Sequence, residues 1–308
     1  MKILLLGRNG QLGWQLQRSL APLGEVIALA SQAQDNPNQW CGDLAKPEGL
    51  RHTLREIAPD LVVNAAAYTA VDKAQTETEK AYAVNALGPA VLAEETLRLG
   101  AWLAHYSTDY VFDGSGTRSW RESDACAPLS VYGASKRQGE LEVARNPRHL
   151  ILRTSWVYAA RGSNFAKTML RLGAERDELR VIDDQMGAPT GAELLADASA
   201  IALRQAMAQP ALAGLYHCAA SGQTSWHGYA QFVFQEARAL GIPVRVSQER
   251  LVPIKSAEYP VAAPRPLNSR LDCAKIADVF SIHLPSWQLG VRRILQEIAL
   301  TKTYEKYP

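Results

Sequence analysis

The segment VYGASK holds a tyrosine and a lysine four residues apart, Tyr132 and Lys136. On a helix this spacing places both side chains on one face, one turn apart. A free phenol has a pKa near 10, so it needs help to exchange protons near neutrality. Lowering that pKa by about 3 units corresponds to roughly 4 kcal/mol in favour of the phenolate, and a neighbouring ammonium is a plausible source. The pair therefore predicts an acid with the cation that tunes it, although Y-x-x-x-K alone also occurs by chance.

A run of hydroxyl groups precedes this pair in the segment HYSTDYVFDG. Thr108 stands where an apolar run ends, and its hydroxyl could hold a reacting oxygen atom in place. His105 precedes that position inside the apolar run, so we interpret it as buried structure rather than as a base. We interpret Asn85, further upstream, as a backbone-bonding residue in its helix.

Three glycines near the start of the chain separate an apolar run from an amphipathic one. Gly7, Gly10 and Gly13 follow the spacing G-x-x-G-x-x-G in LLLGRNGQLGWQL. Glycine permits a tight turn, close approach of a phosphate to backbone N–H groups, and close helix–strand packing. The turn therefore predicts binding of a dinucleotide pyrophosphate at a helix N-terminus. The predicted cofactor-binding residues there are Gly7, Arg8, Asn9, Gly10, Gln11 and Leu12.

The end of the second apolar run bears on coenzyme choice. EVIALASQ has Ala30 and Ser31 where dinucleotide-binding proteins often carry an acid. Such an acid would bind a ribose 2′-hydroxyl and repel a 2′-phosphate. Its absence, with Arg8 nearby, favours NADPH without excluding NADH. Asp43 is either an acceptor for the adenine edge or a helix-capping acid ahead of Pro47, and both interpretations stay open.

Composition excludes several classes of partner. The chain has 308 residues, 47% hydrophobic and 21% charged, with a net charge of +2. So small a charge creates no long-range field for nucleic acid or a membrane surface, and we expect neither partner. No apolar run approaches the roughly 20 residues of a membrane helix, and we expect no secretory signal. The four cysteines are scattered without metal-ligand spacing, which predicts a reduced, cytoplasmic setting and no metal centre.

Apolar and amphipathic runs alternate along the first half of the chain. This alternation predicts a Rossmann-like, doubly wound parallel sheet followed by a smaller C-terminal α/β substrate domain. Residues 1–155 plus about 190–220 would form the dinucleotide-binding domain, and about 156–189 plus 221–308 the substrate-binding domain. The predicted strands are 2–7, 25–30, 60–67, 101–108, 149–158 and 212–220, and the predicted helices include 11–24, 47–59, 71–100 and 226–241.

Several of these segments together resemble one enzyme superfamily. GRNGQLG, NAAAYT, STDYVF and YGASK look like the extended short-chain dehydrogenase/reductases. RTSWVY, NFAKTMLRL, DQMGAPTGAELL, GLYHCAASG and RPLNSRLD are more specific and resemble the dTDP-4-dehydrorhamnose reductase family, from residue 1 to beyond 290. The resemblance implies a reductase that moves hydride from NADPH or NADH to C4 of dTDP-4-dehydro-L-rhamnose (dTDP-6-deoxy-L-lyxo-4-hexulose), giving dTDP-L-rhamnose for polysaccharide synthesis.

The same resemblance implies roles for individual residues. Tyr132 would protonate the developing alkoxide, Lys136 would hold the nicotinamide ribose, and Thr108 would bond the ketone oxygen. Further cofactor-binding positions implied are Asp43, Leu44, Ala65, Ala66, Ala67 and Tyr106, and the substrate-binding positions are Thr108, Asp109, Trp156 and Arg265, the last at the diphosphate. A purely structural interpretation also stays open for two of them: Trp156 would pack between the domains, and Arg265 would be a solvated loop residue.

Departures from the family pattern limit what is implied. Tyr110 stands where related sugar dehydratases need an acid, so dehydration is disfavoured. A nucleotide-sugar 4-epimerase and a non-catalytic dinucleotide-binding regulatory subunit remain the alternatives. In the family a glutamate is linked to a Mg²⁺-assisted homodimer contact, but Gln15 stands here. Glu193 remains, and one carboxylate is a weak Mg²⁺ site, which argues against bound metal and against that mode of dimerisation.

Overall fold

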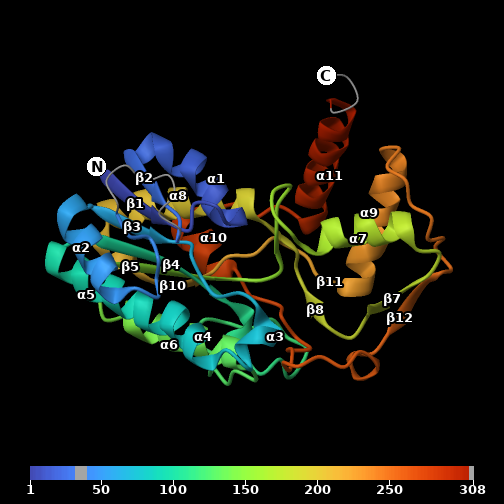
Figure 1. The fold of residues 1–308 in the computed structure, drawn as a ribbon, viewed down its shortest axis with the longest axis horizontal. Coiled ribbons are helices and arrows are strands. Elements are labelled where there is room, and N and C mark those ends of the chain that lie inside the picture. Colours follow the sequence, from blue (N-terminus) through green and yellow to red (C-terminus); the bar gives the residue numbers. More distant parts are fainter. Residues whose placement is uncertain (32–39, 305–308) are drawn as a thin grey trace.

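The computed structural model describes residues 1–31 and 40–304. Its centre is a six-stranded sheet with the order β10-β5-β4-β3-β1-β2, in which every neighbouring pair is parallel (Figure 1). The strands are β1 (Lys2–Leu6), β2 (Glu25–Leu29), β3 (Leu61–Asn64), β4 (Trp102–Thr108), β5 (His149–Thr154) and β10 (Gly214–His217). The predicted return of residues 212–220 to the sheet is confirmed, and β10 forms its edge beside β5.

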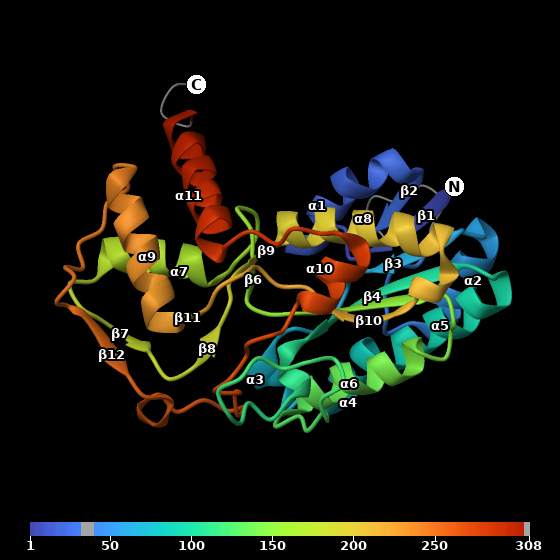
Figure 2. The same cartoon turned by 180° about the vertical axis from the view of Figure 1, so that it is seen from behind.

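Helices cover both faces of this sheet, which confirms the doubly wound α/β class (Figures 1 and 2). One face carries α1 (Gln11–Leu20), α8 (Ala192–Ala208) and α10 (Ala274–Phe280), and the other carries α2 (Pro47–Ile57), α5 (Gly88–Leu99) and α6 (Val131–Val143). Along β1, Ile3 and Leu5 enter the first core and Leu4 and Leu6 the second. Successive side chains point to opposite faces, so a strand covered on both sides must be apolar throughout.

The predicted helix at 71–100 is not continuous. The structure divides it into α3 (Val71–Ala74), α4 (Thr78–Tyr82), a π-helical segment η2 (Ala83–Leu87) and α5. Pro89 at the start of α5 has no N–H to donate to the carbonyl of Asn85, four residues earlier, so an α-helical turn cannot close there. The Asn85 side chain bonds both the N–H and the carbonyl of Tyr68, at 2.8 and 3.0 Å, so its interpretation as a backbone-bonding residue in a helix is confirmed.

The predicted strand at 149–158 is also interrupted. β5 ends at Thr154, and Trp156 has a φ of 49°, in the left-handed region that redirects the chain. The next residues form β6 (Val157–Tyr158), which pairs with β9 (Thr190–Gly191) outside the main sheet. The sequence pattern could not reveal this break, because the residues on both sides of it are buried.

A second, smaller α/β core is built mainly from residues after β5 (Figure 2). It packs α7 (Phe165–Glu175), α9 (Trp226–Ala239) and α11 (Trp287–Tyr304) together. Beside them lie the pairs β7 (Leu179–Ile182) with β12 (Leu251–Ile254) and β8 (Met186–Gly187) with β11 (Thr224–Ser225). Short 3₁₀ turns complete the elements: η1 (Ala21–Leu23), η3 (Asp109–Val111), η4 (Pro210–Leu212) and η5 (Ser256–Glu258). Among the described residues, no helix is both long and apolar enough to cross a bilayer.

The turn from β1 to α1 depends on Gly7. Its φ is 88°, and a Cβ atom there would lie 2.8 Å from the backbone nitrogen of Ala66, just beyond β3. Gly116 has a similar φ of 69°, but nothing lies within 4 Å of its Cβ position. Both glycines therefore have a positive φ that would strain any other residue. Of the two, Gly7 lacks room for a Cβ atom and Gly116 has it.

We expect Gly116→Ala to lower the free energy of unfolding by about 1 kcal/mol, the cost of a left-handed alanine. Gly7→Ala should cost about 2–4 kcal/mol, because overpacking against β3 adds to the same strain. Urea unfolding of the two variants measures the difference. Equal losses would show that the close approach of Gly7 to Ala66 has no energetic weight.

Candidate active site

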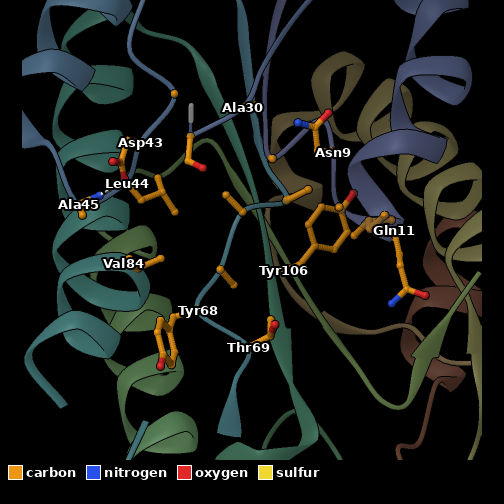
Figure 3. A pocket seen from close by; sticks show the side chains of 18 of the residues that line it. Asn9, Gln11, Ala30, Asp43, Leu44, Ala45, Tyr68, Thr69, Val84 and Tyr106 are labelled. Atoms are coloured by element: carbon orange, nitrogen blue, oxygen red, sulfur yellow. Dashed lines mark hydrogen bonds between the residues drawn. The ribbon is translucent and has the colours of Figure 1, made fainter. Parts of the chain in front are cut away.

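A cleft of about 1280 Å³ opens at the carboxyl ends of the parallel strands. It lies where β1 and β3 are neighbours, the point at which the strand order reverses and where open α/β sheets bind ligands. In Figure 3, Asp43, Leu44 and Ala45 lie on one side of the cleft and Asn9 and Gln11 on the other. Thirteen sequence-predicted residues line it: Gly7, Asn9, Gly10, Gln11, Leu12, Asp43, Leu44, Ala65, Ala66, Ala67, Tyr106, Tyr132 and Lys136.

The glycine turn has the geometry that an anionic group needs. Gly10 is the N-cap of α1 and brings no side chain to occupy the first-turn N–H groups. A Cβ at Gly13 would overlap the carbonyl oxygen of Gly7, so only glycine lets the helix start this close to the strand. The helix dipole adds partial positive charge at this point. The residues present therefore fit a dinucleotide pyrophosphate.

The far end of the cleft carries Ala30, Ser31, Asp43 and Lys46. The Asp43 carboxylate accepts from the N–H of Ala45 at 3.0 Å, which stabilises the turn before α2 without capping its first residue. Pro47 stands in the first turn of α2, as predicted. Arg8 is not among the lining residues; its guanidinium lies 3.5 Å from the carbonyl oxygen of Ala28.

Thr108 and Tyr132 are brought together from the end of β4 and the start of α6. Burial raises the pKa of the Tyr132 phenol to about 12 and outweighs the opposing effect of the neighbouring Thr108 hydroxyl. This direction is opposite to the lowering expected from the Tyr–Lys spacing, because burial penalises the charged phenolate. In the protein itself Tyr132 is therefore held as a neutral acid.

Asp109 lies directly behind this pair. Its carboxylate accepts from the Thr108 hydroxyl at 3.0 Å, and its side chain is buried. Burial raises the pKa of Asp109 to about 6. Thr108 in turn accepts from the N–H of Tyr110 at 3.2 Å, so the 3₁₀ turn η3 fixes the position of the hydroxyl. Thr108 and Asp109 themselves are not among the residues that line the cleft.

Lys136 is a buried cation with few partners. Its Nζ donates to the carbonyl oxygen of Tyr106 at 2.6 Å and lies 3.2 Å from Nε2 of His105. Burial lowers the pKa of Lys136 to about 8, and the charge of Glu140 opposes that shift. His105 is 1% exposed and His105 Nδ1 lies 3.1 Å from the Asn64 amide, so its assignment as a buried residue is confirmed.

A second buried pair supports α6 from behind. Arg153 on β5 donates to both carboxylate oxygens of Glu140 at 2.7 Å, and each side chain is 1% exposed. Glu140 stands one helical turn after Lys136 on α6. Lys136, Glu140 and Arg153 therefore form one layer of buried charged side chains. Removing one partner of such a pair leaves a buried charge without compensation.

The predicted substrate residues outside the cleft lining have defined partners. Trp156 stacks on Trp226 with ring centroids 3.6 Å apart, and the virtual Cβ of Gly187 lies against its indole. Arg265 forms a two-pronged ion pair with Asp72, at 3.1 and 2.7 Å, from the proline-rich segment to α3. Its interpretation as a freely solvated loop residue is therefore wrong.

Sequence reasoning missed part of the lining. Tyr68 and Thr69 follow Ala67 directly, and Thr154 ends β5, so continuing each motif to the end of its strand could have found them. Lys46, Lys80 and Leu195 carry no such signal, because the fold brings them in from helices. The remaining missed residues are Ala30, Ser31, Trp40, Cys41, Gly42, Ala45, Gly49, Val84, Ser107 and Val157.

No cluster of three or more metal-ligating side chains occurs among residues 1–31 and 40–304. Glu193 lies 3.3 Å from Arg293, which neutralises the one carboxylate retained from the family's metal contact. The residues present therefore do not fit a Mg²⁺ site.

The fold and the cleft define a Rossmann-like protein of the extended short-chain dehydrogenase/reductase class. The chain belongs to the family described as the RmlD substrate binding domain, whose model matches residues 1–300. It is 53% identical over 302 residues to a dTDP-4-dehydrorhamnose reductase of Escherichia coli K12, covering 98% of this chain and 99% of that protein.

Solved structures agree with this assignment. A dTDP-4-dehydrorhamnose reductase of Clostridium acetobutylicum superposes with a TM-score of 0.85 at 35% identity, covering 97% of this chain and 99% of that one. A dTDP-4-dehydrorhamnose reductase of Bacillus anthracis, solved in complex with NADP, gives a TM-score of 0.83 at 33% identity and covers 96% and 99%. The resemblance inferred from the motifs is confirmed.

We expect Asp109→Asn to raise the free energy of unfolding by about 3 kcal/mol at pH 8 and by about half as much at pH 5. Because folding raises the pKa of Asp109 to about 6, the protein loses stability as the pH rises from the pKa of this group in the unfolded chain toward 6. Asparagine does not ionise, so the variant does not suffer that loss. Urea unfolding at both pH values measures the effect.

Asp113→Asn is the matched control. The pKa of Asp113 is lowered by its bond from the backbone N–H of Ser115, so the substitution should not stabilise the protein at pH 8. An equal gain for Asp109→Asn at the two pH values would contradict the raised pKa.

Proposed function

We propose that this protein reduces dTDP-4-dehydro-L-rhamnose to dTDP-L-rhamnose with NADPH, or with NADH, as the hydride source. The observation that carries the proposal is the junction of three features in one cleft: the glycine turn, the phenol of Tyr132 and the buried Lys136. The family assignment supports the substrate, because fold alone does not identify one.

The side chains divide the work by position. When bound, the reduced nicotinamide supplies hydride to C4 of the keto-sugar. Tyr132 donates its phenolic proton to the oxygen that becomes the alcohol, and its raised pKa keeps that proton in place until the oxygen becomes basic. Thr108, fixed by η3, hydrogen-bonds the same oxygen, and Lys136 holds the ribose hydroxyls and offers positive charge near the phenolate.

Coenzyme recognition follows from the two ends of the cleft. Gly7, Asn9, Gly10, Gln11 and Leu12 would hold the pyrophosphate, and Asp43, Leu44, Ala65, Ala66, Ala67 and Tyr106 would line the nucleosides. Arg8, beside the cleft lining, would be the candidate for a 2′-phosphate. Ala30 and Ser31 place no carboxylate at the end of β2, and the cation of Lys46 lies on the lining, so the end of β2 itself does not repel a 2′-phosphate. The NADP-bound neighbour supports NADPH as one coenzyme.

The division of labour extends to the whole chain. We propose that residues 1–155 plus about 190–220 bind the dinucleotide and that about 156–189 plus 221–308 bind the sugar nucleotide, with Asp109, Trp156 and Arg265 at the substrate.

A cytoplasmic setting is part of the proposal, and the four cysteines, all free thiols, are consistent with it. A homodimer also belongs to the proposal.

We expect Tyr132→Phe to lower kcat/KM by about 10²–10⁴-fold, because the variant loses its general acid. The control is Tyr110→Phe, whose ring contacts Tyr132 edge-to-face at 5.5 Å, and which should stay within about threefold of the natural chain. The measurement follows NAD(P)H oxidation with the keto-sugar as substrate.

The same assay separates the alternatives. A 4-epimerase would interconvert sugars without net coenzyme consumption, and a regulatory subunit would bind the dinucleotide without any turnover. Either result with the natural chain would overturn the reductase proposal.

A diphosphate at Arg265 would compete with Asp72 for the guanidinium. We therefore expect Asp72→Asn to lower KM for the sugar nucleotide by several fold, because it frees Arg265 from its ion pair. Steady-state kinetics measures the change. Asp124→Asn, which breaks the similar pair with Arg118, is the control and should leave KM unchanged. A KM that rises in Asp72→Asn would show that the pair shapes the site instead.

A further inference from the structure

Three buried polar side chains connect the ends of β3 and β4 to α6. The Asn64 amide nitrogen lies 3.1 Å from His105 Nδ1, and His105 Nε2 lies 3.2 Å from Lys136 Nζ. Asn64 and His105 are each 1% exposed and Lys136 is 2% exposed. In such surroundings every donor needs an acceptor, so the proton positions along this row are constrained.

The orientation of Asn64 is decided by its other end. Its Oδ1 accepts from the N–H of Ala66 at 3.2 Å, which turns the amide NH₂ group toward His105. An amide NH₂ only donates, so Nδ1 of the imidazole must accept. A neutral imidazole then carries its proton on Nε2, the atom that faces Lys136.

This tautomer conflicts with an ammonium at Lys136. An ammonium group has donors only, so it would place one donor against the Nε2–H of His105. The free amine of Lys136 can accept that hydrogen while still donating to the carbonyl oxygen of Tyr106 at 2.6 Å. The row therefore favours the amine. A proton on Nδ1 would remove the conflict at Lys136 but would place an N–H against the NH₂ group of Asn64, so that tautomer needs an acceptor at residue 64.

We infer that His105 is a positioning residue for Lys136: Asn64 selects the ring tautomer, and the tautomer sets whether Lys136 Nζ is bonded as an amine or as an ammonium. The inference rests on the proposed function for its catalytic meaning, because Lys136 touches the coenzyme there. It gives Asn64, at the end of β3, a role that the motifs do not assign.

The other charged groups around the row act differently. Glu140 on α6 favours the ammonium of Lys136 but is itself engaged by Arg153 on β5 and Arg137 on α6. Burial, followed by the charge of Lys136, lowers the pKa of His105, so the imidazole stays neutral while the lysine titrates. Asn64 therefore acts on Lys136 through the position of the proton on the His105 ring, and not through a charge on that ring.

Asn64→Asp tests the inference directly. A carboxylate only accepts, so it binds both the Ala66 N–H and an Nδ1–H, which moves the ring proton and presents Nε2 as an acceptor to the ammonium. We expect the titration of Lys136 to move upward by about 1 pH unit or more. Acetylation of Lys136 by acetic anhydride, followed by mass spectrometry across pH, reads its amine fraction in the full chain without turnover.

Two further variants separate the tautomer from other effects. Asn64→Asp in a His105→Leu background should lose more than about half of the shift, because no ring remains to transmit it. His105→Gln should also shift the titration upward, since its amide oxygen can turn toward Lys136, and it serves if the Asn64→Asp substitution prevents folding. Asn146→Asp, an equally buried change bonded to Thr96 and Ala101, should leave the titration unchanged.

The inference is overturned if neither Asn64→Asp nor His105→Gln moves the Lys136 titration, or if the Asn64→Asp shift survives intact without the ring. NAD(P)H oxidation with the keto-sugar is measured separately on the natural chain. If the natural chain shows no turnover but the Lys136 titration shifts as expected, the proposed function is overturned and the inference about Asn64 and His105 holds. Failure of the proposed function and failure of this inference are therefore distinguishable.

Discussion

Burial of both faces of a parallel sheet is the constraint on which this structure depends. Helices on either side oblige β1, β3 and β4 to be apolar along most of their length, so polar groups gather where the strands end. Because all six strands run the same way, those ends share one edge. The glycine turn after β1 and the residues Tyr106 and Ser107 near the end of β4 therefore line one cleft without any direct link in sequence.

The cost of this arrangement is a layer of charge inside the protein. Lys136, Glu140 and Arg153 are nearly or fully buried on α6 and β5, and each needs a defined partner to be tolerated there. The charges of the bidentate Arg153–Glu140 pair compensate each other, whereas the partners of Lys136 within residues 1–31 and 40–304 are the Tyr106 carbonyl and the His105 ring. This difference lowers the pKa of Lys136 and leaves it responsive to its neighbours, which suits a residue beside a proton donor.

Departures from regular structure occur beside the same edge. The π-helical segment η2 places Asn85 against the backbone of Tyr68, which lines the cleft, and the left-handed Trp156 ends the path of β5. Tyr68 and Trp156 belong to NAAAYT and RTSWVY, two of the motifs that carry the family resemblance. Local irregularity at functional sites is expected, because a regular helix or strand cannot aim these groups.

Alternating apolar runs and the Gly7, Gly10, Gly13 spacing were enough to determine the doubly wound sheet and most of one cleft wall, since these depend on local period and turn geometry. The Tyr132–Lys136 spacing likewise determined which face of α6 meets the cleft. Only the tertiary structure decided the Asp72–Arg265 pair, the Asn64–His105–Lys136 row and the raised pKa of Tyr132. These depend on burial and on contacts between distant segments, and neither quantity is encoded in the spacing of residues along the chain.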